Sequence, residues 1–323
     1  MLKILELFGG IGSPRIALRN IGIPVKSIDY VEIDLKAVKS YNAMFAKELP
    51  YKTQSVVGWD LKPDILIHGS PCQDFSIAGL QKGADPGTET RSSLMWETIR
   101  IIQQMGAWKP RIVIWENVKN VLSKHMIHNF NGYLRKMEKL GYANSFEVLD
   151  SREFGLPQAR ERVFTISCLD GTHFDFTDLI RTPMRDIKEF MSDYREEHIV
   201  TQPSMLSLID GTSKSTFNGR VEVIKDYCTT ITTKQMRSPN SGVIEVPEGY
   251  RYLTELECWR LQGYADADYY NALSVHPGQE GKLNGALYKQ AGNSIPVTIF
   301  ESIFRKILLG EVVEIHEKQL SVI

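Results

Sequence analysis

Two reactive clusters follow short apolar runs that are typical of buried strands. Cys72, in the sequence Pro-Cys-Gln, comes soon after the run 64–68. A cysteine at the carboxyl end of a strand is a candidate nucleophile when its thiolate is stabilised. Glu116 and Asn117 directly follow the run 111–115, and a glutamate beside a nucleophile can donate or accept a proton when its pKa is raised. The simpler alternatives are an inert core cysteine and a helix cap formed by Asn117.

A pair of arginines lies in the sequence Gln-Ala-Arg-Glu-Arg at 158–162, just before the run 163–168. Because alternate residues of a strand face the same side, Arg160 and Arg162 are expected to point together into one cleft. Two guanidinium groups there could hold a phosphate or a substrate carbonyl. Ion pairs at the surface are the alternative.

A glycine-rich turn, Phe-Gly-Gly-Ile-Gly at 8–12, follows the first apolar run. Glycines at such a turn let a ligand approach the backbone closely. Arg15 stands where the dinucleotide fingerprint needs its third glycine, which argues against a pyrophosphate cradle. Glu32 lies about 20 positions further on, the spacing at which an acidic side chain holds a ribose. The pair predicts a site for an adenosine-type cofactor, with a tight turn and a surface glutamate as the alternative.

A second glycine motif, Gly-Asn-Ser-Ile-Pro-Val at 292–297, precedes the last helical pattern. Ser294 is expected to cap that helix, and Pro296 to lie in its first turn. A capped helix with no further role is the alternative.

The first half of the chain alternates strand and helix patterns, which predicts an α/β fold with a parallel sheet covered on both faces. The carboxyl ends of parallel strands meet at one edge, so Cys72 and Glu116 are expected to lie close together. Strands are expected at 3–7, 25–33, 64–68, 111–115, 145–149 and 163–168, and helices at 14–20, 35–47, 92–105, 254–261 and 295–309.

The chain changes character after about residue 175. Residues 200–245 are rich in Ser, Thr, Asn and Gly and contain several Lys and Arg. We expect a first domain of residues 1–175, completed by residues 285–323, and a smaller, loop-rich domain of residues 176–284.

The composition excludes several protein classes. The chain is 42% hydrophobic and 24% charged, which argues against disorder, and no apolar run approaches the roughly 18 residues of a membrane span. The first residues do not resemble a signal peptide. The net charge of -1 excludes a uniformly basic coat but not a local basic groove. The four cysteines form no Cys-x-x-Cys pair, so we expect neither a metal site nor a disulfide framework, and this pattern suits a reducing cytoplasm.

Taken together, these motifs resemble those of the DNA cytosine-C5 methyltransferase family, in the family's order and over most of the chain. Pro-Cys-Gln, Glu-Asn-Val and Gln-Ala-Arg-Glu-Arg resemble its three catalytic motifs, and the segment 251–263 resembles the motif that follows its recognition domain. The resemblance implies a Rossmann-like, S-adenosylmethionine-dependent methyltransferase fold with a small, loop-rich target-recognition domain. The implied cofactor-binding residues are Phe8, Gly10, Ile11, Gly12, Glu32, Ile33, Asp60, Leu61, Asn293 and Ser294.

The resemblance also implies a mechanism. The Cys72 thiolate would add to C6 of a cytosine turned out of the DNA helix, Glu116 would give N3 a proton, and C5 would then take the methyl group. Arg162 would hold the O2 carbonyl, with Arg160 near the backbone phosphate or the Cys72 loop. The implied catalytic residues are Pro71, Cys72, Glu116, Asn117, Arg160 and Arg162.

Double-stranded DNA is expected between the two domains, with its phosphates on Lys and Arg of the smaller one. The segment 73–91 contains three glycines and is expected to be a lid that closes on DNA. The implied DNA-binding residues are Gln73, Ser76, Gln158, Thr230, Gln235, Arg237 and Arg260. The chain departs from the family at Ser70, where many members have Phe, and its recognition segment matches only loosely, at the Thr-rich stretch 229–233.

The resemblance leaves several roles open. A tRNA cytosine-C5 methyltransferase of the same fold and a catalytically silent DNA-binding regulator are the main alternatives, and a NAD-type oxidoreductase is a more distant one. We expect a cytoplasmic monomer of bacterial or phage type. It would serve a restriction-modification system with a cognate restriction endonuclease, or act alone.

Overall fold

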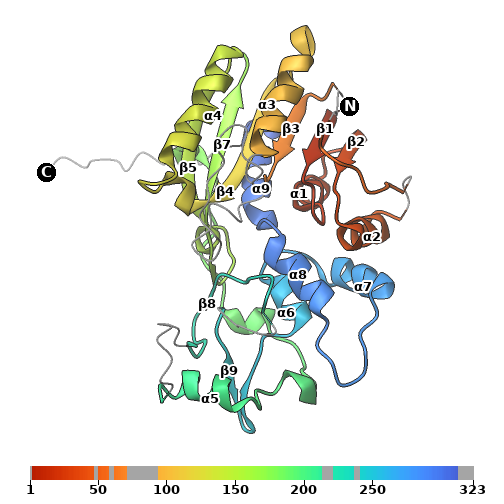
Figure 1. The fold of residues 1–323 in the computed structure, drawn as a ribbon, viewed down its shortest axis with the longest axis vertical. Coiled ribbons are helices and arrows are strands. Elements are labelled where there is room, and N and C mark those ends of the chain that lie inside the picture. Colours follow the sequence, from red (N-terminus) through yellow and green to blue (C-terminus); the bar gives the residue numbers. More distant parts are fainter. Residues whose placement is uncertain are drawn as a thin grey trace, which may run out of the picture.

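A computed structural model describes residues 2–46, 50–57, 62–70, 94–212, 221–235 and 241–311. Within these residues a mixed sheet forms the centre of the larger unit, with the strand order β2-β1-β3-β4-β7-β5 (Figure 1). The strands are β1 (Leu2–Leu7), β2 (Val25–Val31), β3 (Ile65–His68), β4 (Ile112–Val118), β5 (Ala143–Asp150) and β7 (Glu161–Cys168). Strands β1 to β4 are parallel, but β7 is antiparallel to both β4 and β5. The expectation of an entirely parallel sheet was therefore wrong, because the short connection 151–160 turns the chain back on itself.

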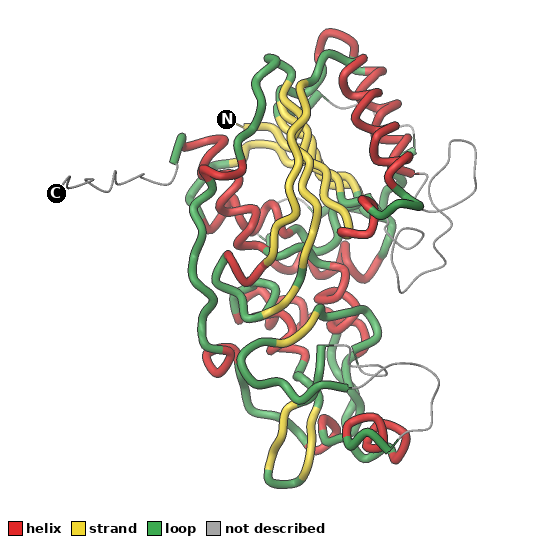
Figure 2. The backbone as a smooth tube through the Cα atoms, turned by 90° about the vertical axis from the view of Figure 1, so that its left-hand side faces the viewer, coloured by secondary structure: helices red, strands yellow, loops and turns green. Residues whose placement is uncertain are grey.

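Both faces of the sheet are apolar because alternate residues of each strand point to opposite sides. Ile4 and Ile67 belong to a buried cluster with α1 and α9, whereas Leu5 and Leu66 belong to another with α3 and α4. Helices therefore cover both sides of the twisted strands (Figure 2), as predicted. The helices of this unit are α1 (Ser13–Asn20), α2 (Leu35–Met44), α3 (Met95–Gln104), α4 (Ile127–Lys139) and α9 (Val297–Phe304).

Three helices lie at the carboxyl ends of the parallel strands, between the sheet and the smaller lower part of the molecule (Figure 1). Trp259 of α6 and Tyr288 of α8 are fully buried in the same cluster as α1 and α9. Val200 and Tyr252 belong to a separate small core. The division of the chain at residues 176–284 stays a prediction. The remaining elements are β6 (Gln158–Ala159), α5 (Pro203–Ile209), β8 (Cys228–Thr229), β9 (Ile244–Val246), β10 (Gly249–Arg251), α6 (Glu255–Arg260), α7 (Asp266–Val275) and α8 (Gly285–Asn293).

The last glycine motif joins two helices. Asn293 ends α8, Ser294 follows it, and Pro296 occupies the N-cap position of α9. The expectation that Ser294 caps the last helix is therefore wrong: its hydroxyl instead bonds with the hydroxyl of Tyr264 at 3.0 Å. The sequence pattern also missed α8, although Asn284 caps it by accepting hydrogen bonds from the N–H groups of its first turn.

Side chains of the segment 251–263 stabilise the start of α6. Thr254 and Glu257 form a reciprocal capping box at the start of α6, in which each side chain accepts from the other residue's N–H. Arg251 donates to both carboxylate oxygens of Glu257, at 2.8 and 2.9 Å, and both side chains are buried. These contacts fix the entry of the chain into α6. In the described part of the chain, no helix has both the length and the apolar character needed to cross a membrane.

Candidate active site

A cavity of about 590 Å³ opens at the carboxyl ends of β1 to β4, within the range of small-molecule sites. Ten residues predicted for the cofactor or for catalysis meet here, although they come from five separate segments of the sequence. The predicted residues that line the cavity are Phe8, Gly10, Ile11, Glu32, Ile33, Glu116, Arg160, Arg162, Asn293 and Ser294. It is one continuous space from Glu32 to Glu116, so a ligand bound at one end would face a second one at the other.

Glu116 and Arg162 form an ion pair in this cavity. Glu116 lies within β4 rather than after it, because β4 continues to Val118 alongside β7, and this corrects the predicted strand end at 115. Val118 pairs with Arg162 and Glu116 with Phe164, so Glu116 and Arg162 are diagonal neighbours across the two strands. Arg162 Nε lies 3.2 Å from Glu116 Oε1.

The carboxyl group of Glu116 is in an environment that favours its protonated form. Burial raises its pKa above the usual value, and the positive charges of Arg162 and Arg160 offset this only in part. A buried carboxyl with a raised pKa can act as a proton donor near neutral pH.

The start of the Pro-Cys-Gln loop adjoins this pair. A Cβ at Gly69 would lie 3.5 Å from Glu116 Oε2, so the main chain passes Glu116 three residues before Cys72. Ser70 Oγ accepts a hydrogen bond from the indole N–H of Trp115 at 3.1 Å and a longer one, 3.5 Å, from the amide of Asn117. Sequence reasoning noted Ser70 only as a departure and missed its anchoring role.

Several predicted residues lie outside the described part of the chain. These are Asp60, Leu61, Pro71, Cys72, Gln73, Ser76, Arg237 and the expected lid 73–91. Their assignments stay predictions.

Arg160 is held by three main-chain carbonyl groups. Its guanidinium donates to the carbonyl oxygens of Ile231 at 3.0 Å, Gly292 at 3.1 Å and Ser294 at 2.6 Å, and its side chain is buried. These bonds tie the Thr-rich stretch to the junction between α8 and α9. Arg160 therefore braces the cavity wall, and its expected place near a backbone phosphate or the Cys72 loop stays a prediction.

The opposite end of the cavity is built by the glycine turn and Glu32. The carboxylate of Glu32 accepts from the N–H groups of Gly10, Ile33 and Asp34, at 2.9, 2.7 and 2.8 Å. The side chain of Ile33, at the same end of the cavity, is 74% exposed. Gly12, also predicted for the cofactor, is the N-cap residue of α1, in the left-handed conformation, and its contact with the cofactor stays a prediction.

The four described residues that were predicted for DNA contact all bond within the protein. The side-chain amide of Gln158 is fully buried between Leu261 and Ile231, and Gln235 is fully buried beside Ser241. Burial argues against base contacts by these two side chains. The other two described side chains also bond within the protein. Arg260 forms an ion pair with Asp266, and the Thr230 hydroxyl donates to the carbonyl oxygen of Ala159.

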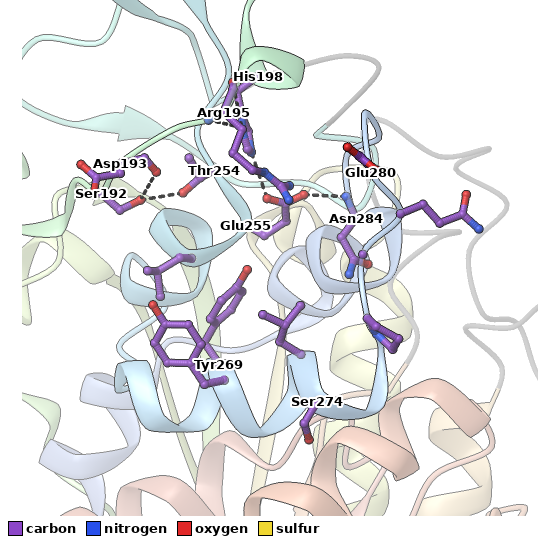
Figure 3. A pocket seen from close by; sticks show the side chains of 16 residues that line it. Ser192, Asp193, Arg195, His198, Thr254, Glu255, Tyr269, Ser274, Glu280 and Asn284 are labelled. Carbon is purple, nitrogen blue, oxygen red and sulfur yellow. Dashed lines mark hydrogen bonds and ion pairs between the residues drawn. The ribbon is translucent and has the colours of Figure 1, made fainter.

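A second cavity of about 500 Å³ lies between α6, α7 and the residues before α5 (Figure 3). On its wall, His198 and Asn284 both approach the carboxylate of Glu255 (Figure 3). His198 Nε2 lies 3.0 Å from Glu255 Oε2, and the N–H of Asn284 donates to Oε1 at 2.5 Å. Within the described ranges no group of three or more His, Cys, Asp or Glu side chains could hold a metal ion.

The sheet, its helical layers and the cavity at the strand ends define the S-adenosylmethionine-dependent methyltransferase fold. The chain belongs to the C-5 cytosine-specific DNA methylase family, whose sequence model matches residues 2–309. It is therefore a DNA cytosine-C5 methyltransferase, and S-adenosylmethionine is the methyl donor of this family.

Relatives of known type support this assignment. The chain is 30% identical to the type II methyltransferase M2.ScrFI of Lactococcus lactis subsp. cremoris, over 96% of this chain and all of the relative. It is 26% identical to the orphan methyltransferase M.SPRI of Bacillus phage SPR, over 95% and 97% of the two chains. The structure of S. pombe Dnmt2 methyltransferase superposes with a TM-score of 0.72 at 18% identity, over 96% of this chain and 99% of that one, which shows a shared fold.

Proposed function

We propose that this chain methylates C5 of cytosine within a specific sequence of double-stranded DNA, with the target base turned out of the helix into the cavity beside β4 and β7. The observation that carries the proposal is the Glu116–Arg162 pair, buried in the cavity wall next to Gly69. A flipped base is read through its Watson–Crick edge. On cytosine that edge presents O2, N3 and the amine side by side, which matches a guanidinium next to a carboxyl group.

The residues at the other end of the cavity fit S-adenosylmethionine. Glu32 is held by three main-chain N–H groups and keeps lone pairs for ribose hydroxyls. The exposed side chain of Ile33 offers an apolar surface to an adenine ring. The bound donor supplies an electrophilic methyl group on a sulfonium.

The chain's own groups would activate the base. The Cys72 thiolate forms a bond to C6, and Glu116 transfers its proton to N3 as the ring gains electron density, so that C5 becomes nucleophilic. After C5 has taken the methyl group, a water-mediated base removes the C5 proton. The electron pair of that bond then expels Cys72 and restores the ring, and N3 returns its proton to Glu116. Arg162 holds O2 throughout.

DNA binding would use the space between the cavity and the smaller unit. Exposed lysines there, such as Lys225 and Lys234, would meet phosphates and give salt-dependent affinity. A monomer in the cytoplasm, acting with a cognate restriction endonuclease or alone, belongs to the same proposal.

The test is to express the chain in a host without cytosine methylation and to map 5-methylcytosine by bisulfite sequencing, with Cys72→Ser as the matched variant. We expect methylation at one short sequence, lost in Cys72→Ser. A folded protein that binds S-adenosylmethionine but leaves DNA unmodified would contradict the proposal, and methylation of tRNA by the same preparation would identify an RNA substrate.

A further inference from the structure

The peptide unit of Gly10 is held from two sides. Its N–H donates to Glu32 Oε2 at 2.9 Å, and its carbonyl oxygen accepts from the Tyr30 hydroxyl at 2.6 Å. Gly10 lines the cavity, whereas Tyr30 is fully buried behind it and does not. The turn cannot shift without breaking one of these bonds.

Two stacked tyrosine rings form the floor under this turn. The rings of Tyr30 and Tyr41 stack with their centroids 3.8 Å apart. A Cβ at Gly9 would lie 2.6 Å from the Tyr30 ring, and one at Gly12 would lie 2.5 Å from the Tyr41 ring. The glycines therefore let the main chain rest directly on the two rings.

The stack is fixed in turn by Glu6, a buried residue of β1. The Tyr41 hydroxyl donates to Glu6 Oε2 at 3.0 Å, and Glu6 is 1% exposed. Burial raises the pKa of Glu6 to about 7, although the charge of Arg15 and the Tyr41 bond act against this. The Arg15 guanidinium lies over the rings of Phe45, at 3.8 Å, and Tyr41, at 5.2 Å. Arg15, at the position of the missing third glycine, thus belongs to the support of the turn.

We propose that Tyr30 is a positioning residue for the methyl donor: its hydroxyl holds the turn 8–12 in the shape that receives the donor, and Glu6 fixes the Tyr30 ring through Tyr41. The inference rests on the proposed use of this cavity. The Tyr30 hydroxyl contacts the main chain of Gly10, which lines the donor end of the cavity. Loss of this contact therefore weakens donor binding equally in the ground state and in the transition state of methyl transfer. Such a change raises KM and leaves kcat unchanged.

The test compares the steady-state kinetics of Tyr30→Phe and Tyr41→Phe with the wild type, at varied S-adenosylmethionine and saturating DNA. Each variant keeps its ring and loses one hydroxyl. We expect KM for the donor to rise about 3- to 10-fold in Tyr30→Phe and about 2-fold in Tyr41→Phe, at unchanged kcat. Tyr142→Phe is the matched control, because the buried Tyr142 hydroxyl also donates to a carbonyl oxygen at 2.6 Å, that of Pro110, away from the cavity.

An unchanged KM in Tyr30→Phe, an equal rise in Tyr142→Phe, or a fall in kcat at constant KM would each overturn the inference. Glu6→Gln keeps an acceptor for Tyr41 and is expected to retain the wild-type KM, whereas Glu6→Ala raises it. The dissociation constant of S-adenosylhomocysteine, measured by calorimetry, gives the same ranking without turnover. If the wild type binds this ligand but methylates nothing, the proposed function fails, and the calorimetric ranking still decides the role of Tyr30.

Discussion

The carboxyl group of Glu116 is subject to two opposing influences. Burial raises its pKa, and the guanidinium groups of Arg162 and Arg160 lower it, with burial the stronger. In the proposed mechanism the protonated form is active, so activity is lost as the pH rises through this pKa. A thiolate at Cys72 has the opposite dependence, because it forms as the pH rises. A bell-shaped profile of rate against pH is the expected result.

Arg162→Gln tests whether Glu116 causes the loss of activity at high pH, which is the alkaline limb of the profile. Removing the nearest positive charge raises the pKa of Glu116 further, so the alkaline limb of the single-turnover methylation rate is expected to move to higher pH. The maximal rate is expected to fall about 10- to 100-fold, because the contact to O2 is weakened. Arg185→Gln, at an exposed ion pair with Glu189, is the control and should leave the profile unchanged. A limb that stays in place or moves to lower pH would show that Glu116 is not the group responsible.

The sequence predicted the residues of this site better than it predicted their contacts. Glu116 lines the cavity, and its residue type and its place near the carboxyl end of a strand were both visible in the sequence, although β4 continues past it to Val118. Tyr30 was missed because its hydroxyl matters only through Gly10, which the fold brings next to it. Gln158 has the chemistry of a base-reading side chain, and only tertiary packing shows that it is buried.

At the scale of elements, alternation of strands and helices predicted the layers but not every strand direction. The connection 151–160 between β5 and β7 is shorter than the dozen or more residues of a parallel crossover, so the antiparallel turn was in principle visible. Helix α8 was not predicted, although Asn284 was an available start signal. The contact between α8 and the Thr-rich stretch 229–233 joins segments with no sequence signal in common.

Gly292→Ala tests that contact. A Cβ at Gly292 would lie 2.3 Å from the carbonyl carbon of Thr232 and 2.4 Å from the nitrogen of Thr233, so the main chain must move. We expect the free energy of unfolding in urea to fall by roughly 1–3 kcal/mol, together with a loss of activity. Gly278→Ala is the matched control: that site has open space within 4 Å, and its free energy should change little. Equal stability of the two variants would show that the close approach is absent in solution.

At the scale of the whole molecule, a buried carboxylate links the smaller unit to the helices at the strand ends. His198 belongs to a 3-10 turn at 196–198, Glu255 to α6, and Asn284 precedes α8, so one carboxylate joins three segments. Burial alone would raise the pKa of Glu255, but the hydrogen bonds from His198 and from the Asn284 N–H together hold it below its usual value. A lowered carboxyl pKa stabilises the folded state at pH values above the unfolded pKa of about 4.5.

Glu255→Gln tests this link through the pH dependence of stability. Breaking a buried pair is expected to reduce the free energy of unfolding by roughly 3 kcal/mol at pH 7. The difference from the wild type should shrink as the pH falls below about 4.5 and through the lowered pKa, because wild-type Glu255 must then also be protonated in the folded state. Glu189→Gln removes an exposed carboxylate from its pair with Arg185 and should change stability by less than about 1 kcal/mol at either pH.

Hydrogen exchange would locate the effect of Glu255→Gln. Amide exchange is expected to become faster around Val200 and Tyr252 of the small core before it does so in the central sheet. A gap between Glu255→Gln and wild type that persists unchanged at low pH would mean that packing, and not the charge of Glu255, joins the two parts of the molecule.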